Sequence, residues 1–174
     1  MQSISRLFDF PYHQLSKNNK ADCLVTKYGE EWVKTSTQEY IDQANAISRA
    51  LLRLGVQKND KIAIISSTNR TEWNICDIGI LQTGAQSVPI YPTIAAEDYE
   101  YILNHSESSY CIVSDSEVFA KLKSVRHNIP SLKDVYSFNE LNDCTNWKTL
   151  FELGEDTSNQ DEVEARKDGV LTTD

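Results

Sequence analysis

The side chains of this chain that are best placed for chemistry lie in three short polar runs, each directly after an apolar run. These runs are Ser66-Ser67-Thr68-Asn69, Tyr91-Pro92-Thr93 and Ser114-Asp115. Hydroxyl groups, together with the unpaired N–H groups of a helix N-terminus, could hold an anion such as a phosphate. Serine, threonine and asparagine also cap helices without any ligand, and this second interpretation is favoured for the first run.

The sequence motifs of nucleotide and cation sites are absent. All six glycines are isolated, so the chain contains neither G-x-G-x-x-G nor G-x-x-x-x-G-K-[ST]. A receiver-type cation site would require adjacent acidic residues after the first strand of the sheet, where this chain has Ser66 and Ser67. Asp115 alone cannot supply such a site and is predicted to be a turn or N-cap residue. The three histidines are scattered, so the residues alone predict no catalytic set and no metal site.

The four cysteines are widely separated, and none belongs to a C-x-x-C pair. Cys76 and Cys111 lie in apolar runs, where a free cysteine behaves as a small hydrophobic residue. We therefore predict reduced thiols, as in a cytoplasmic protein, rather than disulfides or a zinc site.

Helix-capping residues and the spacing of apolar residues predict the first helices and strands that must position these runs. Residues 23–34 are predicted to form a small β-hairpin around Gly29. Ser36 and Glu39 form a capping box, S-x-x-E, before a series of apolar residues at helical spacing that ends at Gly55. This pattern predicts a helix that begins at Ser36 and ends at Gly55.

From residue 61 onward, strands and helices are predicted to alternate. Strands are expected at 61–66, 87–91, 110–114 and 134–138, and helices at 69–84, 96–105, 117–127 and 147–153. Asn69 is expected to cap the first of these helices. Pro89 lacks an N–H group, so its strand is not expected to be central in the sheet. The alternation predicts an α/β fold, with a doubly wound parallel sheet, flanking helices and the small N-terminal β-hairpin.

Composition and charge exclude several classes of protein. Of the 174 residues, 17 are basic and 26 are acidic, and the net charge of −9 disfavours binding to nucleic-acid phosphates. No run approaches the roughly 20 apolar residues of a membrane span, and the N-terminus lacks the pattern of a secretory signal. Between residues 152 and 174, eight acidic residues stand against two basic ones, and this segment is predicted to be solvated or disordered.

The middle of the chain resembles a known family in the order of its motifs. After the helix that begins at Ser36 come KNDKIAIIS (58–66), Asn69-Arg70-Thr71-Glu72-Trp73, LQTGAQSVPIYPT (81–93) and YILNHSES (101–108). Over residues 5–145 this order is similar to the N-terminal subdomain of the adenylate-forming (AMP-binding) superfamily, which includes acyl-CoA synthetases, luciferases and peptide-synthetase adenylation domains. The N-R-x-E-W segment and VPIYPT are most similar to long-chain fatty acid–CoA ligases of bacterial type.

The resemblance implies a two-step reaction for the parent enzyme. A carboxylate attacks the α-phosphate of ATP to give an acyl-adenylate, and the thiol of CoA then displaces AMP. The parent is expected to use ATP, Mg and CoA, with a fatty acid as substrate. In the family, the Ser/Thr/Gly-rich phosphate loop and the catalytic lysine follow the point where this sequence stops, and residues 169–174 are similar to the lead-in of that loop. No catalytic residue is carried over, and the fragment is expected to bind no cofactor and to be inactive alone.

The resemblance also divides the chain and implies a binding surface. Residues 1–150 are expected to form the N-terminal α/β subdomain of an acyl-CoA synthetase, and residues 151–174 an acidic connecting segment leading to the absent phosphate loop. Tyr91, Pro92 and Thr93 are the candidate substrate-binding residues, as one wall of the acyl or CoA cleft. The alternative is that these three residues form only a rigid exit from a strand. The expected partner is the remainder of the parent enzyme, with no nucleic acid.

Self-association of the isolated fragment is also expected, because a sheet edge and apolar faces that meet the rest of the enzyme would be exposed. The expected location is the cytoplasm, or the membrane periphery in the full-length enzyme. Two alternatives stay open. The first is a stand-alone flavodoxin-like or receiver-like binding module, and the second is an adenylate-forming enzyme that acts on another carboxylic acid, such as an aryl or amino acid.

Overall fold

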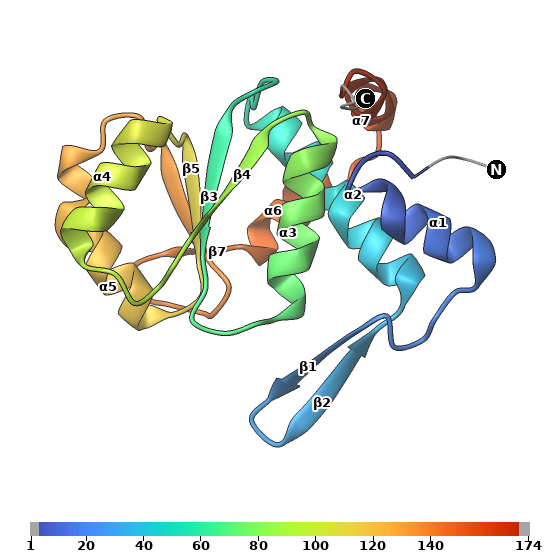
Figure 1. Ribbon diagram of the computed structural model, residues 1–174, viewed down its shortest axis with the longest axis horizontal. Helices are drawn as coiled ribbons and strands as arrows, with labels where there is room; N and C mark the ends of the chain where they lie inside the picture. Colours follow the sequence, from blue (N-terminus) through green and yellow to red (C-terminus); the bar gives the residue numbers. More distant parts are fainter. Residues whose placement is uncertain (1–3, 171–174) are drawn as a thin grey trace. The chain divides into compact units, whose positions relative to one another are not determined.

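The fold is that of a computed structural model, which describes residues 4–170 (Figure 1). The chain divides into two compact units. The described part of the first unit comprises residues 4–58, 69–84 and 150–170, and the second unit comprises residues 59–68 and 85–149. Both units are therefore assembled from segments that are distant from one another in the sequence.

The second unit is built on a five-stranded parallel sheet with the strand order β4-β3-β5-β6-β7. The strands are β3 (Lys61–Ile65), β4 (Gln86–Ile90), β5 (Tyr110–Val113), β6 (Asp134–Ser137) and β7 (Thr145–Asn146). The helices of this unit are α4 (Ala96–Ser106), α5 (Ser116–Val125) and the 3-10 turn η1 (Arg126–Asn128). Because β4 lies on one side of β3 and β5 on the other, the chain winds outward from β3 in both directions, and the predicted doubly wound α/β fold is confirmed.

The edge position of β4 explains how Pro89 is accommodated in a strand. The N–H of Gln86 donates to the carbonyl oxygen of Asp60 at 2.8 Å, so the N–H groups of Gln86 and of every second residue after it point toward β3. Pro89 falls between those residues, where an N–H would point to the open edge. Its missing donor therefore removes no bond from the sheet, as predicted for a strand that is not central.

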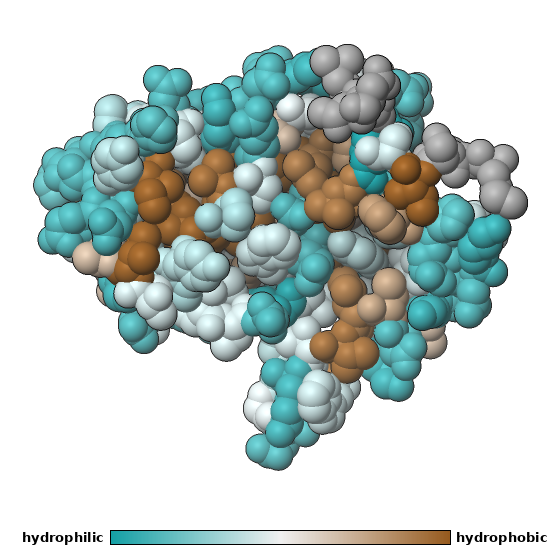
Figure 2. All heavy atoms as spheres, viewed as in Figure 1, coloured by the Kyte–Doolittle hydropathy of each residue, from teal (hydrophilic) through white to brown (hydrophobic). Residues whose placement is uncertain are grey.

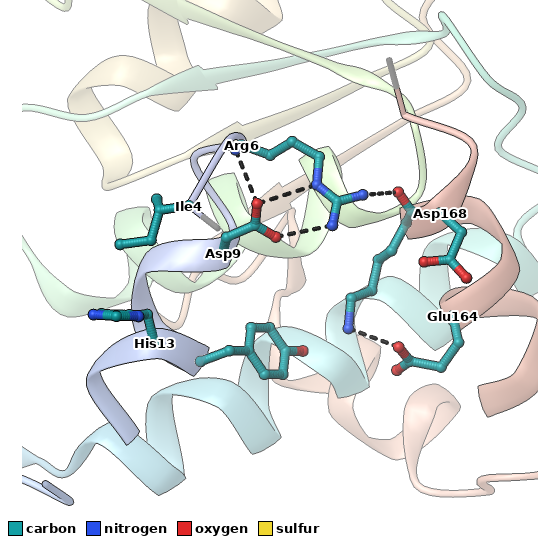
Figure 3. A pocket seen from close by; sticks show the side chains of 8 residues that line it. Ile4, Arg6, Asp9, His13, Glu164 and Asp168 are labelled. Carbon is teal, nitrogen blue, oxygen red and sulfur yellow. Dashed lines mark hydrogen bonds and ion pairs between the residues drawn. The ribbon is translucent and has the colours of Figure 1, made fainter. Parts of the chain in front are cut away.

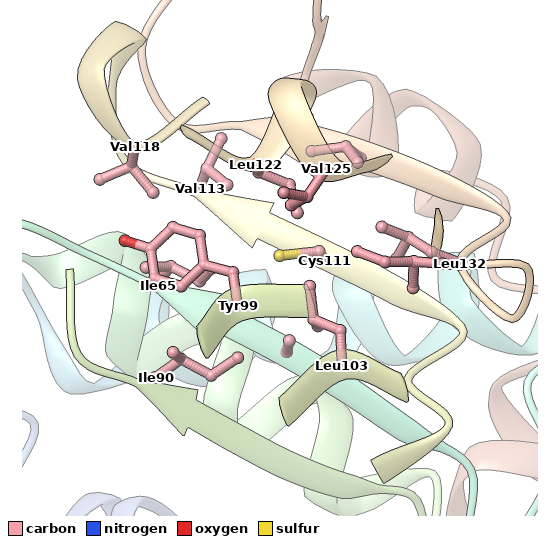
Figure 4. Close-up of a cluster of buried hydrophobic side chains, with 13 residues drawn as sticks. Ile65, Ile90, Tyr99, Leu103, Cys111, Val113, Val118, Leu122, Val125 and Leu132 are labelled. Carbon is pink, nitrogen blue, oxygen red and sulfur yellow. The ribbon is translucent and has the colours of Figure 1, made fainter. Parts of the chain in front are cut away.

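One face of the sheet shares a hydrophobic core with α4 and α5 (Figure 4). In this core Cys111 and Val113 of β5 cluster with Tyr99 of α4 and Leu122 of α5, and all four side chains are fully buried. Short apolar strands and apolar residues at helical spacing on α4 and α5 supply this surface. The burial of apolar side chains holds the two helices on the sheet.

The first unit holds a β-hairpin and the other helices described here. Its elements are α1 (Asp9–Lys17), β1 (Leu24–Tyr28), β2 (Glu31–Thr35), α2 (Thr37–Arg53), α3 (Thr71–Gln82), the greater part of α6 (Lys148–Gly154) and α7 (Gln160–Asp168). Strands β1 and β2 pair antiparallel through a turn at Gly29 and Glu30, with Gly29 at φ 59°, so the predicted hairpin is confirmed. The tip of the hairpin is coloured as hydrophilic or intermediate in hydropathy (Figure 2).

Helix α2 begins at the predicted capping box. The Ser36 hydroxyl accepts a hydrogen bond from the N–H of Glu39 at 3.2 Å, and the Glu39 carboxylate accepts one from the N–H of Ser36 at 2.7 Å. Farther along, α2 packs against Gly79 of α3. A Cβ atom on Gly79 would lie 2.7 Å from Cγ2 of Ile47, so the two helices meet at close range.

Helix α3 begins differently from the prediction. Asn69 does not cap it, because the helix starts at Thr71 and its N-cap residue is Arg70, which makes no side-chain cap bond. Instead, the Thr26 hydroxyl of β1 accepts from the N–H of Thr71 at 2.9 Å, and the two threonine hydroxyls lie 2.8 Å apart. The cap therefore comes from a residue 45 positions earlier in the chain, which a local motif cannot reveal.

The acidic segment is folded through residue 170, contrary to the expectation of a solvated or disordered chain. Helix α6 matches the predicted last helix, and α7 forms within the stretch where no structure was predicted. Val163 of α7 is fully buried, and cationic side chains from the N-terminal part of the chain bind this segment. Such tertiary contacts outweigh local composition. The lead-in expected at residues 169–174 falls mostly on 171–174, which lie outside the described residues.

Candidate functional site

The three polar runs identified in the sequence follow the carboxyl ends of β3, β4 and β5. Because these strands are parallel, their carboxyl ends lie at one edge of the sheet. The winding direction reverses between β3 and β5, and open α/β sheets bind ligands in the crevice at such a point. The candidate site of the second unit therefore comprises residues 66–68, 91–93 and 114–115.

The crevice between β3 and β5 is bridged by hydrogen bonds within the chain itself. The N–H of Ser67 donates to the Ser114 hydroxyl at 3.0 Å, and that hydroxyl donates to the Asp115 carboxylate at 2.6 Å. The Ser66 hydroxyl donates to the carbonyl oxygen of Thr68 at 2.7 Å and folds the loop on itself. These polar groups satisfy one another, which agrees with a structural role for the first run.

Asp115 is the N-cap of α5, as predicted. Its carboxylate accepts from the N–H groups of Glu117 and Val118 at 3.0 and 3.1 Å. Partial burial raises the pKa of Asp115. Hydrogen bonds from Ser114, Ser67 and the helix N–H groups lower it by more, so the pKa lies below its ordinary value. A carboxylate that stays ionised and engaged in a cap is a poor general base. Asp115 is accordingly a structural residue.

Tyr91, Pro92 and Thr93 lie together just after β4, and their backbone is anchored. The carbonyl oxygen of Pro92 accepts from the Tyr99 hydroxyl at 2.8 Å and from Lys121 Nζ at 2.9 Å. These donors belong to α4 and α5, so the exit of β4 is tied to both helices. The Tyr91 side chain is 80% exposed, and Thr93 is exposed as well. The geometry combines a rigid backbone with an aromatic ring presented to solvent.

A second cluster, in the first unit, was not identified from the sequence. Glu72 is buried, forms an ion pair with Arg70 and accepts a hydrogen bond from the Tyr28 hydroxyl at 2.5 Å. The Arg70 guanidinium carbon also lies 5.7 Å from the centroid of the Tyr28 ring. We call these three residues the hairpin clamp, because they join the end of β1 to the start of α3.

Both acidic groups of the hairpin clamp have displaced pKa values. Burial, followed by the hydrogen bond to Glu72, raises the pKa of Tyr28 to about 12. Burial alone would raise the pKa of Glu72, but the hydrogen bonds from Arg70 and Tyr28 outweigh it, and the pKa is lowered. The N-R-x-E-W motif was the available sequence signal, since it contains Arg70 and Glu72. The motif does not contain their partner Tyr28, which lies 44 residues from Glu72.

Two kinds of reactive group to consider in residues 4–170 are metal-ligand clusters and ionised thiols. In this range no group of three or more His, Cys, Asp or Glu side chains is placed to hold a metal ion. Burial raises the pKa of Cys76, Cys111 and Cys144, and all of the cysteines are free, so these three thiols are protonated at neutral pH. No helix in the described range is both long and apolar enough to cross a bilayer.

The chain is similar to known ligases in sequence. The family described as "AMP-binding enzyme" matches residues 12–172. The long-chain-fatty-acid–CoA ligase ACSBG2 of Xenopus laevis is 28% identical over 138 residues, which cover 76% of this chain and 18% of that protein. The long-chain-fatty-acid–CoA ligase FadD15 of Mycobacterium bovis is 34% identical over 104 residues, which cover 60% of this chain and 17% of that protein. The chain thus spans less than a fifth of the length of these two relatives.

Solved structures of ligases share the fold. The anthranilate CoA ligase AuaEII, in complex with anthranoyl-AMP, matches with a TM-score of 0.70 at 21% identity, over 83% of this chain and 26% of that structure. A putative long-chain-fatty-acid CoA ligase from Rhodopseudomonas palustris matches with a TM-score of 0.70 at 19% identity, over 83% of this chain and 35% of that structure. At these identities the likeness concerns the fold alone.

Proposed function

Because the chain belongs to the AMP-binding enzyme family, we propose that it is the N-terminal part of a larger, ATP-dependent long-chain fatty acid–CoA ligase and is inactive alone. The observation that carries this proposal is the family match over residues 12–172 in a chain that spans 18% of a matching ligase. The activity named for the curated relatives supports a long-chain fatty acid as the substrate. Family membership does not favour the alternative of a stand-alone flavodoxin-like or receiver-like module.

The residues of this chain do not fit a complete site for ATP, Mg and CoA. The sequence has no glycine-rich phosphate loop, and residues 4–170 contain no cluster of metal ligands. The crevice between β3 and β5 is bridged by the bond from Ser67 to Ser114. In the proposal, phosphate and metal binding therefore belong to the remainder of the larger enzyme, which is the partner of this chain.

The role proposed for this chain is that of a scaffold. Residues 1–150 form the N-terminal α/β subdomain, and residues 151–174 connect it to the phosphate loop. Tyr91, Pro92 and Thr93 form one wall of the acyl or CoA cleft. The exposed Tyr91 ring on an anchored backbone supports this role, since a rigid aromatic side chain offers contact area at low entropic cost.

The reading frame that carries this chain tests the proposed function. We expect it to continue beyond Asp174 into a Thr-Ser-Gly-rich segment, and we expect the complete product to form palmitoyl-CoA from palmitate, ATP and CoA. A stop codon directly after Asp174 would overturn the proposal, and so would a complete product that activates no long-chain fatty acid. Parallel assays with an aryl acid and an amino acid would then identify a different carboxylic acid substrate.

The binding role of Tyr91 is tested in that complete ligase. Tyr91→Ala should raise KM for the fatty acid or for CoA by about tenfold, as for loss of an aromatic contact. Tyr101→Ala is the matched control, because Tyr101 on α4 is 68% exposed and lies outside the candidate edge. Unchanged KM values for Tyr91→Ala would leave residues 91–93 with only the role of a rigid strand exit.

The proposal also covers location and assembly. We place the complete enzyme in the cytoplasm or at the membrane periphery, and we propose that the isolated chain self-associates. Three apolar side chains that are only partly buried, Val88, Ile94 and Ile102, support self-association, because exposed apolar surface favours contact with a second chain.

A further inference from the structure

The segment from residue 150 to residue 170 is bound by cationic side chains that donate to its backbone carbonyl oxygens. The four pairs, with the donor first, are Arg49–Gly154 (2.7 Å), Arg53–Asp156 (2.9 Å), Lys58–Gly169 (2.9 Å) and Arg6–Lys167 (2.5 Å). Gly154 ends α6 and Lys167 lies in the last turn of α7, where carbonyl groups have no partner within the helix. Arg49, Arg6 and Lys58 thus bind carbonyl groups at or just after the C-terminal ends of α6 and α7, where the helix dipole also favours positive charge.

Arg49 is the most buried of these four donors. It is 9% exposed, and its Nη1 also donates to Gln160 Oε1 at 2.6 Å. In return, Asn159 Nδ2 donates to the carbonyl oxygen of Arg49 at 3.2 Å. One residue of α2 therefore binds the end of α6 and the start of α7 together. Loss of its side chain would leave buried polar groups without partners, which is costly.

Gly154 sets how closely the segment approaches α2. A Cβ atom at this position would lie 2.0 Å from the carbonyl oxygen of Ala46 and 2.8 Å from the carbonyl carbon. No side chain fits there unless α6 moves away from α2, because the obstacle is backbone. Gly169, near the other end of the segment, differs: its nearest neighbours would lie 3.5 Å from an added Cβ atom, which is ordinary contact.

At its far end the segment faces α1 across a small pocket (Figure 3). Lys167 Nζ lies 4.1 Å from the centroid of the Tyr12 ring, and the Tyr12 hydroxyl lies within hydrogen-bond distance of Asn45 and Gln82. The cavity between α1 and α7 has a volume of only about 90 Å³. Val163, at 0% exposure, is the buried apolar residue of α7.

We propose that residues 150–170 form a strap that docks on α1 and α2 as one unit, and that Arg49 and Gly154 are the positioning residues that set its place. The strap is a property of this chain. Its consequence for catalysis rests on the proposed function. In the larger ligase, the strap would hold the start of the following phosphate-loop segment in a fixed position. A solvated linker, which the acidic composition predicts, would leave that segment free to move.

Hydrogen exchange of the 174-residue chain, measured by mass spectrometry, tests the strap. In the wild type, the amides of α7 should exchange far more slowly than those of an unstructured peptide. Arg49→Gln and Gly154→Ala should each raise the exchange rate of these amides by about tenfold or more, while the amides of the β-sheet remain unchanged.

Two matched controls make the comparison specific. Arg126→Gln removes another guanidinium that donates to a backbone carbonyl, that of Lys133 at 3.0 Å in the second unit. Gly169→Ala adds a methyl group to the same segment at a position where it fits. Neither control should change the exchange of α7.

Arg49→Lys separates positioning from a general loss of stability. A lysine keeps the charge, but its compact ammonium lacks the planar fork with which Arg49 binds both Gly154 and Gln160. Exchange in α7 should therefore fall between that of the wild type and that of Arg49→Gln. If Gly154→Ala loses its helical circular dichroism altogether, the Arg49 series still decides the test.

Three outcomes would overturn the strap: unprotected α7 amides in the wild type, equal effects of Arg126→Gln and Arg49→Gln on those amides, or no difference between Arg49→Lys and Arg49→Gln. None of these measurements uses ATP, CoA or a fatty acid. A failure of the ligase proposal would therefore leave the result for the strap unchanged, and the two failures can be told apart.

Discussion

Glu72 is a single carboxylate that connects two elements of the first unit. Its ion pair with Arg70 and its hydrogen bond from Tyr28 join the start of α3 to the end of β1. The side chains of Glu72 and Arg70 are 11% and 10% exposed, so their pairing is shielded from water and its disruption costs more than that of a surface pair. Thr26 caps Thr71 beside them. The hairpin clamp and this cap together fix the hairpin on α3.

Glu72→Gln should lower the free energy of unfolding by about 1–3 kcal/mol, because the amide leaves the largely buried Arg70 guanidinium without its counter-charge. Urea denaturation measures this change. Glu117→Gln is the control, since the Glu117 carboxylate is 82% exposed and lies 3.8 Å from Lys121 Nζ. Its loss should cost less than about 1 kcal/mol. Equal losses in the two variants would show that the hairpin clamp contributes no more than a surface pair.

The lowered pKa of Glu72 also fixes the direction of a pH dependence. The carboxylate binds a proton more readily in the unfolded chain, so its stabilising contribution is present above the ordinary pKa of 4.5 and is lost as the pH falls through the lowered folded value. Unfolding midpoints measured from neutral pH downward should therefore fall more steeply for the wild type than for Glu72→Gln. Parallel pH profiles would contradict the assignment.

Helices and strands whose positions are set by neighbouring residues could be predicted from the sequence. The capping box places the start of α2 at Ser36, and the missing N–H of Pro89 places β4 away from the centre of the sheet. The start of α3 and the whole of α7 depend instead on Thr26 and Arg49, which are distant in the chain. These contacts leave no local pattern. The sequence therefore predicted a cap at Asn69, which is wrong, and no helix in the acidic stretch.

The strand order along the sequence was enough to predict the candidate edge, which comprises residues 66–68, 91–93 and 114–115. The hydrogen bonds at that edge could not be predicted. Parallel strands bring the polar runs after β3, β4 and β5 to one edge whatever the side chains are. The bond from Ser67 to Ser114 depends on the spacing of β3 and β5 in three dimensions. The anchoring of Pro92 likewise requires Tyr99 and Lys121 to reach it from two helices.

The packing of α2 against α3 is tested by Gly79→Ala. In an isolated helix, alanine is more favourable than glycine by about 1 kcal/mol. Here the added Cβ atom would lie 2.7 Å from Cγ2 of Ile47 and 3.0 Å from the carbonyl oxygen of Ala44, so the helices must separate. We expect a loss of about 1–3 kcal/mol in the free energy of unfolding, as in overpacked cores. A stabilised variant in thermal or urea denaturation would contradict the close approach of the two helices.

At the scale of the whole molecule, the isolated chain is expected to self-associate. Three apolar residues that pack against the core of the second unit are only partly buried, namely Val88, Ile94 and Ile102. Figure 2 shows apolar side chains at the surface of the second unit beside α4. Light scattering should therefore report a mass above that of the single chain, rising with concentration. A constant monomer mass at high concentration would refute this expectation.

The chain supplies part of the fold found in solved ligases and a candidate binding edge, while residues 4–170 hold no cluster of metal ligands and the sequence has no phosphate loop. Phosphate-transfer chemistry depends on positioned charges around the reacting groups. In the proposed function, those charges come from the larger enzyme. The 174-residue chain and the complete product of its reading frame are therefore expected to differ in activity.

Incubation of the purified 174-residue chain with ATP, Mg, CoA and palmitate, beside the complete product of the reading frame, tests the central claim most directly. Mass spectrometry of the products measures palmitoyl-CoA. The account predicts that the complete product forms palmitoyl-CoA and that the 174-residue chain forms none. Palmitoyl-CoA formed by the chain alone would contradict it.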